Sequence, residues 1–241
     1  MEIMISRRLF LALAGGAIFL PPSIRATENF PSLLDHIILG CNNLATGISF
    51  VEQRTGVRAL FGGVHPDRGT ANALLSLGER HYLEIMAPDP NGKALQPWAT
   101  KQLNVLKELE TPRLITWAIH PDDIDALANK LRASGMQVLG PFPGSRTRPD
   151  GSVLNWKTLN LADDHHGLLP FCIQWSAGSH HPSLDAPAGC HIQHFAAVDP
   201  HPDELSKMYQ RIGVDVTTER GQESRLRAGI SGPKGTLDLS S

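Results

Sequence analysis

The sequence predicts an α+β fold built from repeated βαβββ modules. From residue 33 onward, one pattern recurs three times: a short apolar strand, an amphipathic helix, and three strands separated by Gly or Pro turns. The three copies begin at "LLDHIILG", "LITWAIH" and "CHIQHFAAVD". A unit of this size is too small to bury a core alone, so we expect the copies to pack on one another.

The first module shows the pattern most clearly. A strand is predicted at residues 33–39, where strict alternation puts His36 on the same face as Leu34 and Asp35 on the opposite face. The helix that follows has apolar residues spaced by four and three, and it ends at Gly56. Three strand-like runs come next, at residues 57–61, 70–77 and 81–88.

The second and third modules repeat this order. The second has a strand at residues 114–120, a helix that ends at Gly135, and strands that read "MQVLGPF", "VLNWKTL" and "LPFCIQW". The third, looser module has a strand at residues 190–199 and ends with "GTLDLS". The segment between them, "SAGSHHPSLDAPAG", has the composition of a linker, and its His180 and His181 are interpreted as sites of adventitious metal binding.

Composition excludes several classes of protein. An apolar share of 41% is ordinary for a soluble globular chain. A net charge of −2, without a long run of one sign, argues against nucleic acid as a partner and favours a small-molecule ligand. Three cysteines are too few for a disulfide framework, although an oxidising compartment could still pair two of them.

Residues 1–26 have the character of a signal peptide. A short Arg-bearing start precedes an apolar stretch at residues 9–20 and a cleavage site after Ala26. The apolar stretch is shorter than the ~20 residues that span a bilayer, so we expect no stable membrane span. "SRRLFL", with Arg7 and Arg8 adjacent, resembles a twin-arginine signal and predicts export to the periplasm; an ordinary secretory signal is the alternative.

Two histidine–carboxylate pairs occupy corresponding strands of the first and third modules. Aligning the two copies puts His194 over His36 and Asp238 over Glu84. Imidazole nitrogen and carboxylate oxygen on rigid strands suit Zn, Fe, Mn or Ni. A strand histidine can equally be a core residue with a hydrogen bond, but an unpaired buried carboxylate is costly, so Glu84 favours a site shared with His36.

The second module lacks this pair. Gln174 stands at the position of Glu84, and Thr116 or Trp117 stands at the position of His36. Gln174 could offer an amide oxygen to a metal or a hydrogen bond to a ligand, whereas Trp117 could not bind a metal.

Three segments, "LDHIILGCNNL", "FGGVHPDRGTANALLSLGERHYLEIMAPDP" and "RTRPDGSVLNW", resemble the glyoxalase-like domain family of the vicinal oxygen chelate superfamily. The resemblance implies a glyoxalase-like domain at residues 33–178, in which two modules form half-open curved sheets around a metal or ligand, and a third module at residues 190–241. It also implies His36 and Glu84 as ligands of a divalent metal. His194 and Asp238 would complete the set if modules one and three pair, within one subunit or across a homodimer.

The resemblance implies chemistry on a small oxygenated metabolite, as a metal-dependent lyase, isomerase or dioxygenase. His65 and Asn72 match the family's spacing. His65 and Glu84 are candidates for acid–base chemistry. The alternative for His65 is a loop histidine that caps the turn before Pro66. Arg146 and Arg148 could clamp a carboxylate or phosphate. Gln174 is a further candidate for substrate binding. Trp156 is predicted to line the pocket or to belong to the core. The alternatives are a metal-free small-molecule binding protein of the same fold and a purely structural domain.

Overall fold

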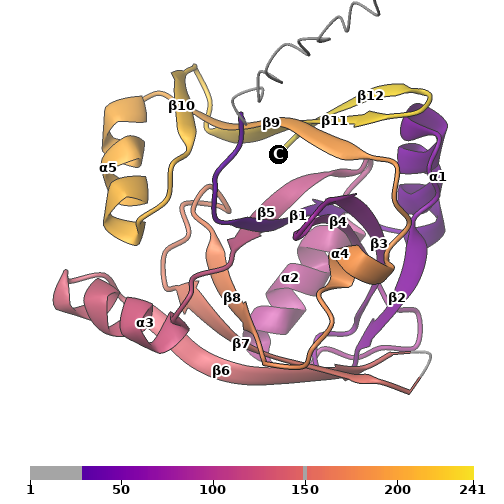
Figure 1. Ribbon diagram of the computed structural model, residues 1–241, viewed down its shortest axis with the longest axis horizontal. Coiled ribbons are helices and arrows are strands. Elements are labelled where there is room, and N and C mark those ends of the chain that lie inside the picture. The colour runs from indigo at the N-terminus through magenta and orange to yellow at the C-terminus, as the bar shows by residue number, and fades with distance from the viewer. Residues whose placement is uncertain (1–28, 149–150) are drawn as a thin grey trace, which may run out of the picture.

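The computed structural model describes residues 29–148 and 151–241, which form three consecutive strand–helix–strand–strand–strand units (Figure 1). This confirms the predicted α+β fold of repeated βαβββ modules. The export signal predicted for residues 1–26 lies outside the described residues and stays a prediction. Within the described part of the chain, no helix is long and apolar enough to cross a membrane.

Each unit contains one helix and four strands. The first consists of β1 (Leu34–Gly40), α1 (Leu44–Thr55), β2 (Leu60–His65), β3 (Thr70–Gly78) and β4 (His81–Pro88). The second consists of β5 (Arg113–Ile119), α3 (Ile124–Ala133), β6 (Val138–Thr147), β7 (Val153–Leu161) and β8 (Phe171–Trp175). The third consists of β9 (His191–Asp199), α5 (Pro202–Ile212), β10 (Thr217–Arg220), β11 (Arg225–Gly232) and β12 (Gly235–Ser240).

The first two units form one eight-stranded sheet with the order β2-β3-β4-β1-β5-β8-β7-β6. In each unit the first strand lies parallel to the last, and antiparallel pairing of β1 with β5 joins the two units. The sheet curls until its edge strands β2 and β6 contact each other. The result is the half-open, curved sheet that the family resemblance implied.

The third unit has the same order of elements but different strand pairing. It forms a separate four-stranded sheet with the order β10-β9-β11-β12, in which β9 pairs with β10 and β11 and not with the last strand. Asp238 on β12 therefore does not occupy the position that Glu84 occupies on β4, and the predicted alignment of the two residues does not hold in the fold.

Two helices in the connections were not predicted. The first, α2 (Pro97–Lys107), begins with a proline at its first position and packs Leu106 against Ile38 and Met86. The second is the short α4 (Pro182–Asp185) in the linker before the third unit. Both lie on the face of the curled sheet opposite the main core, which we call the inner face.

The main apolar core lies between the other face of the sheet, the helices α1 and α3, and the third unit. Trp117 on β5 is fully buried there, 4.7 Å from the Phe195 ring and 6.1 Å from the Tyr209 ring. Its Nε1 donates a hydrogen bond to the Leu168 carbonyl at 2.8 Å. Trp117 thus joins the second unit to the third and points away from the inner face.

We predict that Trp117→Ala lowers the free energy of unfolding by about 4 kcal/mol, because it removes a buried ring and leaves a cavity between two units. Urea unfolding at neutral pH measures the change. Trp98→Ala is the control, because that ring is 55% exposed and its loss should cost less than about 1 kcal/mol. Equal losses for the two variants would contradict the packing described for Trp117.

Candidate functional site

A β-bulge at Asp35 sets the direction of the polar side chains on β1. The register between β1 and β5 shifts between Leu34 and His36, so Asp35 has no residue opposite it on β5. A bulge breaks the alternation of side chains. Leu34 joins the main core, while Asp35 contacts His36 on the inner face. The prediction that Asp35 and His36 lie on opposite faces was therefore wrong.

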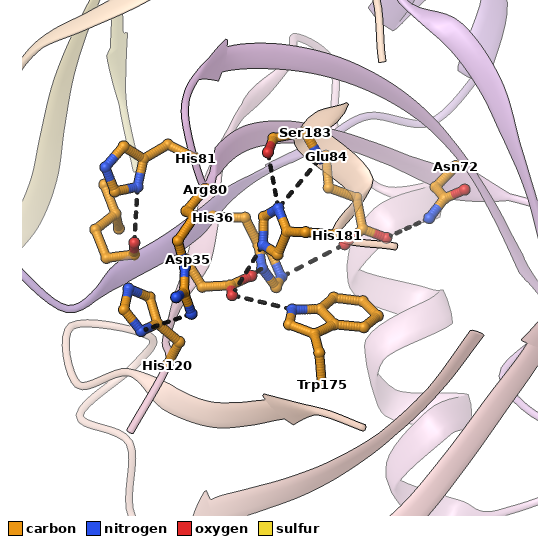
Figure 2. Close-up of polar contacts among 11 residues, drawn as sticks. Asp35, His36, Asn72, Arg80, His81, Glu84, His120, Trp175, His181 and Ser183 are labelled. Atoms are coloured by element: carbon orange, nitrogen blue, oxygen red, sulfur yellow. Dashed lines mark hydrogen bonds and ion pairs between the residues drawn. The ribbon is translucent and has the colours of Figure 1, made fainter. Parts of the chain in front are cut away.

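The Asp35 carboxylate is fully buried and receives hydrogen bonds on both oxygens (Figure 2). Its Oδ1 lies 2.6 Å from His36 Nδ1. Its Oδ2 accepts from Trp175 Nε1 at 3.0 Å and lies 3.2 Å from Nε2 of His181. Burial raises the pKa of Asp35, but the hydrogen bonds from His181 and His36 outweigh burial and hold it well below its usual range. Asp35 is therefore ionised at neutral pH.

His36 and Glu84 face each other on the neighbouring parallel strands β1 and β4. His36 Nε2 lies 3.6 Å from Glu84 Oε2, and the His36 ring stacks on Tyr82 with 4.5 Å between ring centroids. Both side chains are almost completely buried. The structure thus brings together the two residues that the sequence singled out first.

Asn72 on β3 links Glu84 to a cation from the second unit. Its Nδ2 donates to Glu84 Oε1 at 2.7 Å, and its Oδ1 accepts from Arg146 Nη1 at 2.9 Å. His65 Nε2 lies 3.9 Å from the same Glu84 oxygen. The predicted residues His65, Asn72 and Arg146 therefore lie around Glu84, on strands from both halves of the sheet.

The electrostatics of this cluster keep Glu84 charged and His65 neutral. Burial raises the pKa of Glu84, but His65, His36, the amide of Asn72 and the Arg146 guanidinium outweigh burial, and the net pKa is lowered. Burial lowers the pKa of His65 to about 4, against the opposing effect of Glu84. At neutral pH the site therefore holds a carboxylate base beside a neutral imidazole.

Arg68, in the turn between β2 and β3, is a further cation that the sequence analysis missed. Its guanidinium lies over the Trp98 ring, 5.2 Å from the ring centroid, and makes no hydrogen bond or ion pair with another described residue. Burial lowers the pKa of Arg68, and the charge of Glu84 raises it. The Nε atom of Arg146 is also buried without a partner among the described residues. Both guanidinium groups therefore retain donors for a ligand.

The structure does not bring His194 and Asp238 to Glu84. They lie in the separate sheet of the third unit, where the His194 ring covers Gly229 and Asp238 is exposed to solvent. A site shared by the first and third modules is therefore not formed within this chain, and a site across a homodimer stays a prediction.

Three other candidates contact parts of the fold outside the cluster. Gln174 accepts from the Ile124 backbone N–H and donates to a carbonyl before α3, so it caps that helix. Arg148 binds the linker through the Asp185 carboxylate and the backbone carbonyl of residue 180. Trp156 packs 5.5 Å from the Trp175 ring, behind the indole that donates to Asp35.

Besides Arg68, sequence reasoning missed three members of the site: Asp35, Trp175 and His181. An acidic residue inside an apolar strand was a visible signal for Asp35, but assumed alternation directed it to the other face. Trp175 lies 140 residues and His181 lies 146 residues from Asp35 in the chain. No local pattern encodes contacts over such separations.

The donor set does not fit a metal centre held by the protein alone. His36 Nε2 and Glu84 Oε2 could approach one ion, but of the residues of the second unit that the sequence aligned with them, Thr116 or Trp117 and Gln174, Trp117 lies in the core and Gln174 caps a helix. Among the residues that the structure describes, no three His, Cys, Asp or Glu side chains are arranged to hold a metal ion.

Glu84 is almost completely buried. Two cavities lie elsewhere: one of about 420 Å³ between the end of α2 and the start of β5, and one of about 380 Å³ lined by residues of α1, β2 and the turn after β4. Neither is lined by His36 or Glu84, and Glu84 is only 6% exposed. A ligand that reaches Glu84 must therefore displace side chains that cover this carboxylate.

The chain belongs to the glyoxalase-like domain family, whose model matches residues 34–213. No curated protein matches it significantly. A hypothetical protein from Staphylococcus aureus has a similar structure, with a TM-score of 0.57, 17% identity, and coverage of 86% of this chain and 84% of that chain. This likeness shows the fold alone.

Smaller proteins with lower structural similarity match part of the chain. Methylmalonyl-CoA epimerase from Streptomyces coelicolor, solved with 2-nitronate-propionyl-CoA, has 24% identity and a TM-score of 0.42, and the match covers 61% of this chain and 96% of that chain. The epimerase from Mycobacterium tuberculosis has 19% identity and a TM-score of 0.41, with coverage of 64% and 92%.

The partly buried His65 should make folding stability depend on pH. Its pKa falls from 6.5 to about 4 on folding, so the unfolded chain binds more protons between these values and stability is lost as the pH falls through this window. Between pH 7 and pH 4.5, the free energy of unfolding of His65→Gln should fall by about 2 kcal/mol less than that of the wild type. Urea unfolding at the two pH values measures this difference. The exposed His191, changed in the same way, should not alter the pH profile.

Proposed function

We propose that this protein is an enzyme that acts on a small oxygenated metabolite by proton transfer, with Glu84 as the base. The observation that carries the proposal is the convergence of His36, His65 and Glu84 on the inner face, with 3.6 Å and 3.9 Å between their facing atoms. Glu84 is ionised at neutral pH and is therefore free to take a proton from a carbon next to a carbonyl group.

Each neighbour of Glu84 has a defined part in this reaction. Asn72 orients the Glu84 carboxylate through a 2.7 Å hydrogen bond and holds Arg146 beside it. When Glu84 takes a proton, negative charge develops on the substrate oxygen, and the buried Nε of Arg146 offers it a donor. Return of the proton gives an isomer or epimer, whereas loss of a leaving group gives a lyase product.

The substrate class follows from the charges that line the site. Arg68 and Arg146 present cationic donors beside a carboxylate that becomes neutral during the reaction. An anionic or strongly polarised carbonyl compound matches these donors, because guanidinium groups bind carboxylate and enolate oxygens well. Small hydroxy and keto carbonyl compounds are therefore the first candidates.

Glu84→Gln should reduce proton exchange by about 100-fold or more, because the amide cannot accept the proton. The assay incubates the protein in D₂O with hydroxyacetone, dihydroxyacetone or pyruvate and follows deuterium incorporation next to the carbonyl by proton NMR. The control is Glu52→Gln, an exposed carboxylate paired with Arg58, which should leave the rate unchanged.

A wild-type protein that binds these compounds without exchanging their protons would contradict the proposal. It would favour the alternative function, a metal-free binding protein of the same fold that holds a small molecule without transforming it.

A second candidate is a metal-dependent lyase, isomerase or dioxygenase that uses Zn, Fe, Mn or Ni. It is favoured by the hydrogen bond from His36 to Asp35, because metal-binding histidines typically donate their other ring nitrogen to a carboxylate. His36 and Glu84 would hold the ion, which would polarise two adjacent oxygens of the substrate. The described residues supply two of the expected ligands, so substrate or water would have to supply the rest.

Metal analysis distinguishes the two candidates. The metal-dependent function predicts about one divalent ion per chain in protein purified without chelators, and its loss in both His36→Ala and Glu84→Ala. Full deuterium exchange by protein that contains no stoichiometric metal would contradict it. The exposed His191→Ala variant serves as the control for adventitious binding.

We also propose that the protein is exported to the periplasm by the twin-arginine route, on the basis of the adjacent Arg7 and Arg8 in "SRRLFL". Replacement of both arginines by lysine should retain the protein in the cytoplasm, as measured by cell fractionation. Unchanged export of that variant would instead favour an ordinary secretory signal.

A further inference from the structure

The linker before the third unit takes part in the site around Glu84. Its short helix α4 packs on β3 and β4, and the ring of His181 packs edge-on against the Tyr82 ring. His181 points at Asp35 (Figure 2). The linker is fastened on its other side by Arg148, which binds the backbone carbonyl of His180 at 2.9 Å. His181 is therefore held over the inner face by contacts at both ends of the segment.

The proton positions on the three residues His181, Asp35 and His36 follow from their partners. The backbone N–H of Ser183 donates to His181 Nδ1 at 3.2 Å, so the proton of a neutral His181 is on Nε2, which faces Asp35 Oδ2 at 3.2 Å. An ionised carboxylate only accepts hydrogen bonds. His36 Nδ1, which is 2.6 Å from Asp35 Oδ1, must therefore carry a proton.

This arrangement decides what His36 presents to Glu84. With a proton on Nδ1, the neutral imidazole has a lone pair on Nε2, and that atom lies 3.6 Å from Glu84 Oε2. A lone pair at this position can accept a hydrogen bond from Glu84 once the carboxylate has taken a proton. The opposite tautomer would direct an N–H at Glu84 and would stabilise its charged form instead.

We infer that Asp35, held by His181 of the linker, is a positioning residue that keeps His36 in the tautomer whose Nε2 lone pair faces Glu84. The effect on turnover rests on the proposed function. The tautomer itself does not, because it is a property of the resting protein.

The asymmetry of the hydrogen bonds to Asp35 makes the effect of Asp35→Asn specific. Two N–H donors, from Trp175 and His181, point at the Oδ2 position, whereas only His36 faces the Oδ1 position. The carbonyl oxygen of an asparagine will therefore take the Oδ2 position, and its NH₂ group will face His36 Nδ1. His36 must then accept at Nδ1 and carry its proton on Nε2.

Nitrogen-15 NMR of the histidine rings tests this inference, at a pH where the His36 imidazole is neutral. We expect the wild type to show His36 protonated on Nδ1 and Asp35→Asn to show it protonated on Nε2. In the deuterium-exchange assay, Asp35→Asn should lower kcat by about 100-fold with little change in KM. Asp125→Asn makes the same substitution at an exposed carboxylate that pairs with Lys157, and it should change neither readout.

A wild-type His36 protonated on Nε2 overturns the inference, and this measurement needs no variant to fold. Retention of the Nδ1 proton in folded Asp35→Asn also overturns it. The part of the linker is tested by His181→Ala, which we expect to lower kcat by about tenfold; unchanged kcat and unchanged His36 nitrogen shifts would remove the linker from the inference. If the tautomers are as expected but the wild type exchanges no protons, the proposed function fails and the positioning of His36 by Asp35 stands.

Discussion

A single buried charge, the carboxylate of Asp35, imposes a constraint on three parts of the chain. An ionised carboxylate removed from water costs several kcal/mol unless hydrogen bonds satisfy it. The donors come from His36 on β1, Trp175 at the end of β8 and His181 in the linker. The bulge in β1, the position of the last strand of the second unit and the path of the linker are therefore coupled, because a shift in any of them leaves charge unpaired.

The first two βαβββ units share the same backbone arrangement but carry different functional side chains. The first unit supplies Glu84, His36 and His65, whereas the second supplies the cation Arg146 and the indole of Trp175. Trp117 and Gln174, which the sequence aligned with the first unit's pair, serve the fold: Trp117 fills the core and Gln174 caps a helix. Antiparallel pairing of β1 with β5 joins the first and second units, so that side chains from both units meet on one inner face.

The sequence could predict those features that follow from local periodicity. The cost of an unpaired buried carboxylate correctly predicted that Glu84 lies beside His36, and the repeat of elements predicted the α+β architecture. The bulge at Asp35 could not be predicted, because the sequence of a strand does not show which of its residues lacks a partner on the neighbouring strand. The separate sheet of the third unit could not be predicted either, since the order of elements along the chain does not determine which strands pair. Contacts such as His181 with Asp35 depend on tertiary packing alone.

The site also satisfies a condition on charge that proton transfer imposes. Before the proposed reaction the negative charge is on Glu84, beside Arg146 and within the field of Arg68. After transfer, Glu84 is neutral and the charge is on the substrate oxygen. The total charge in the buried site is unchanged, so the same fixed cations that stabilise the base stabilise the enolate, without new solvation of a charge. The lone pair of His36 Nε2 then accepts from the protonated Glu84, which links the hydrogen bonds of Asp35 to the step in which charge moves.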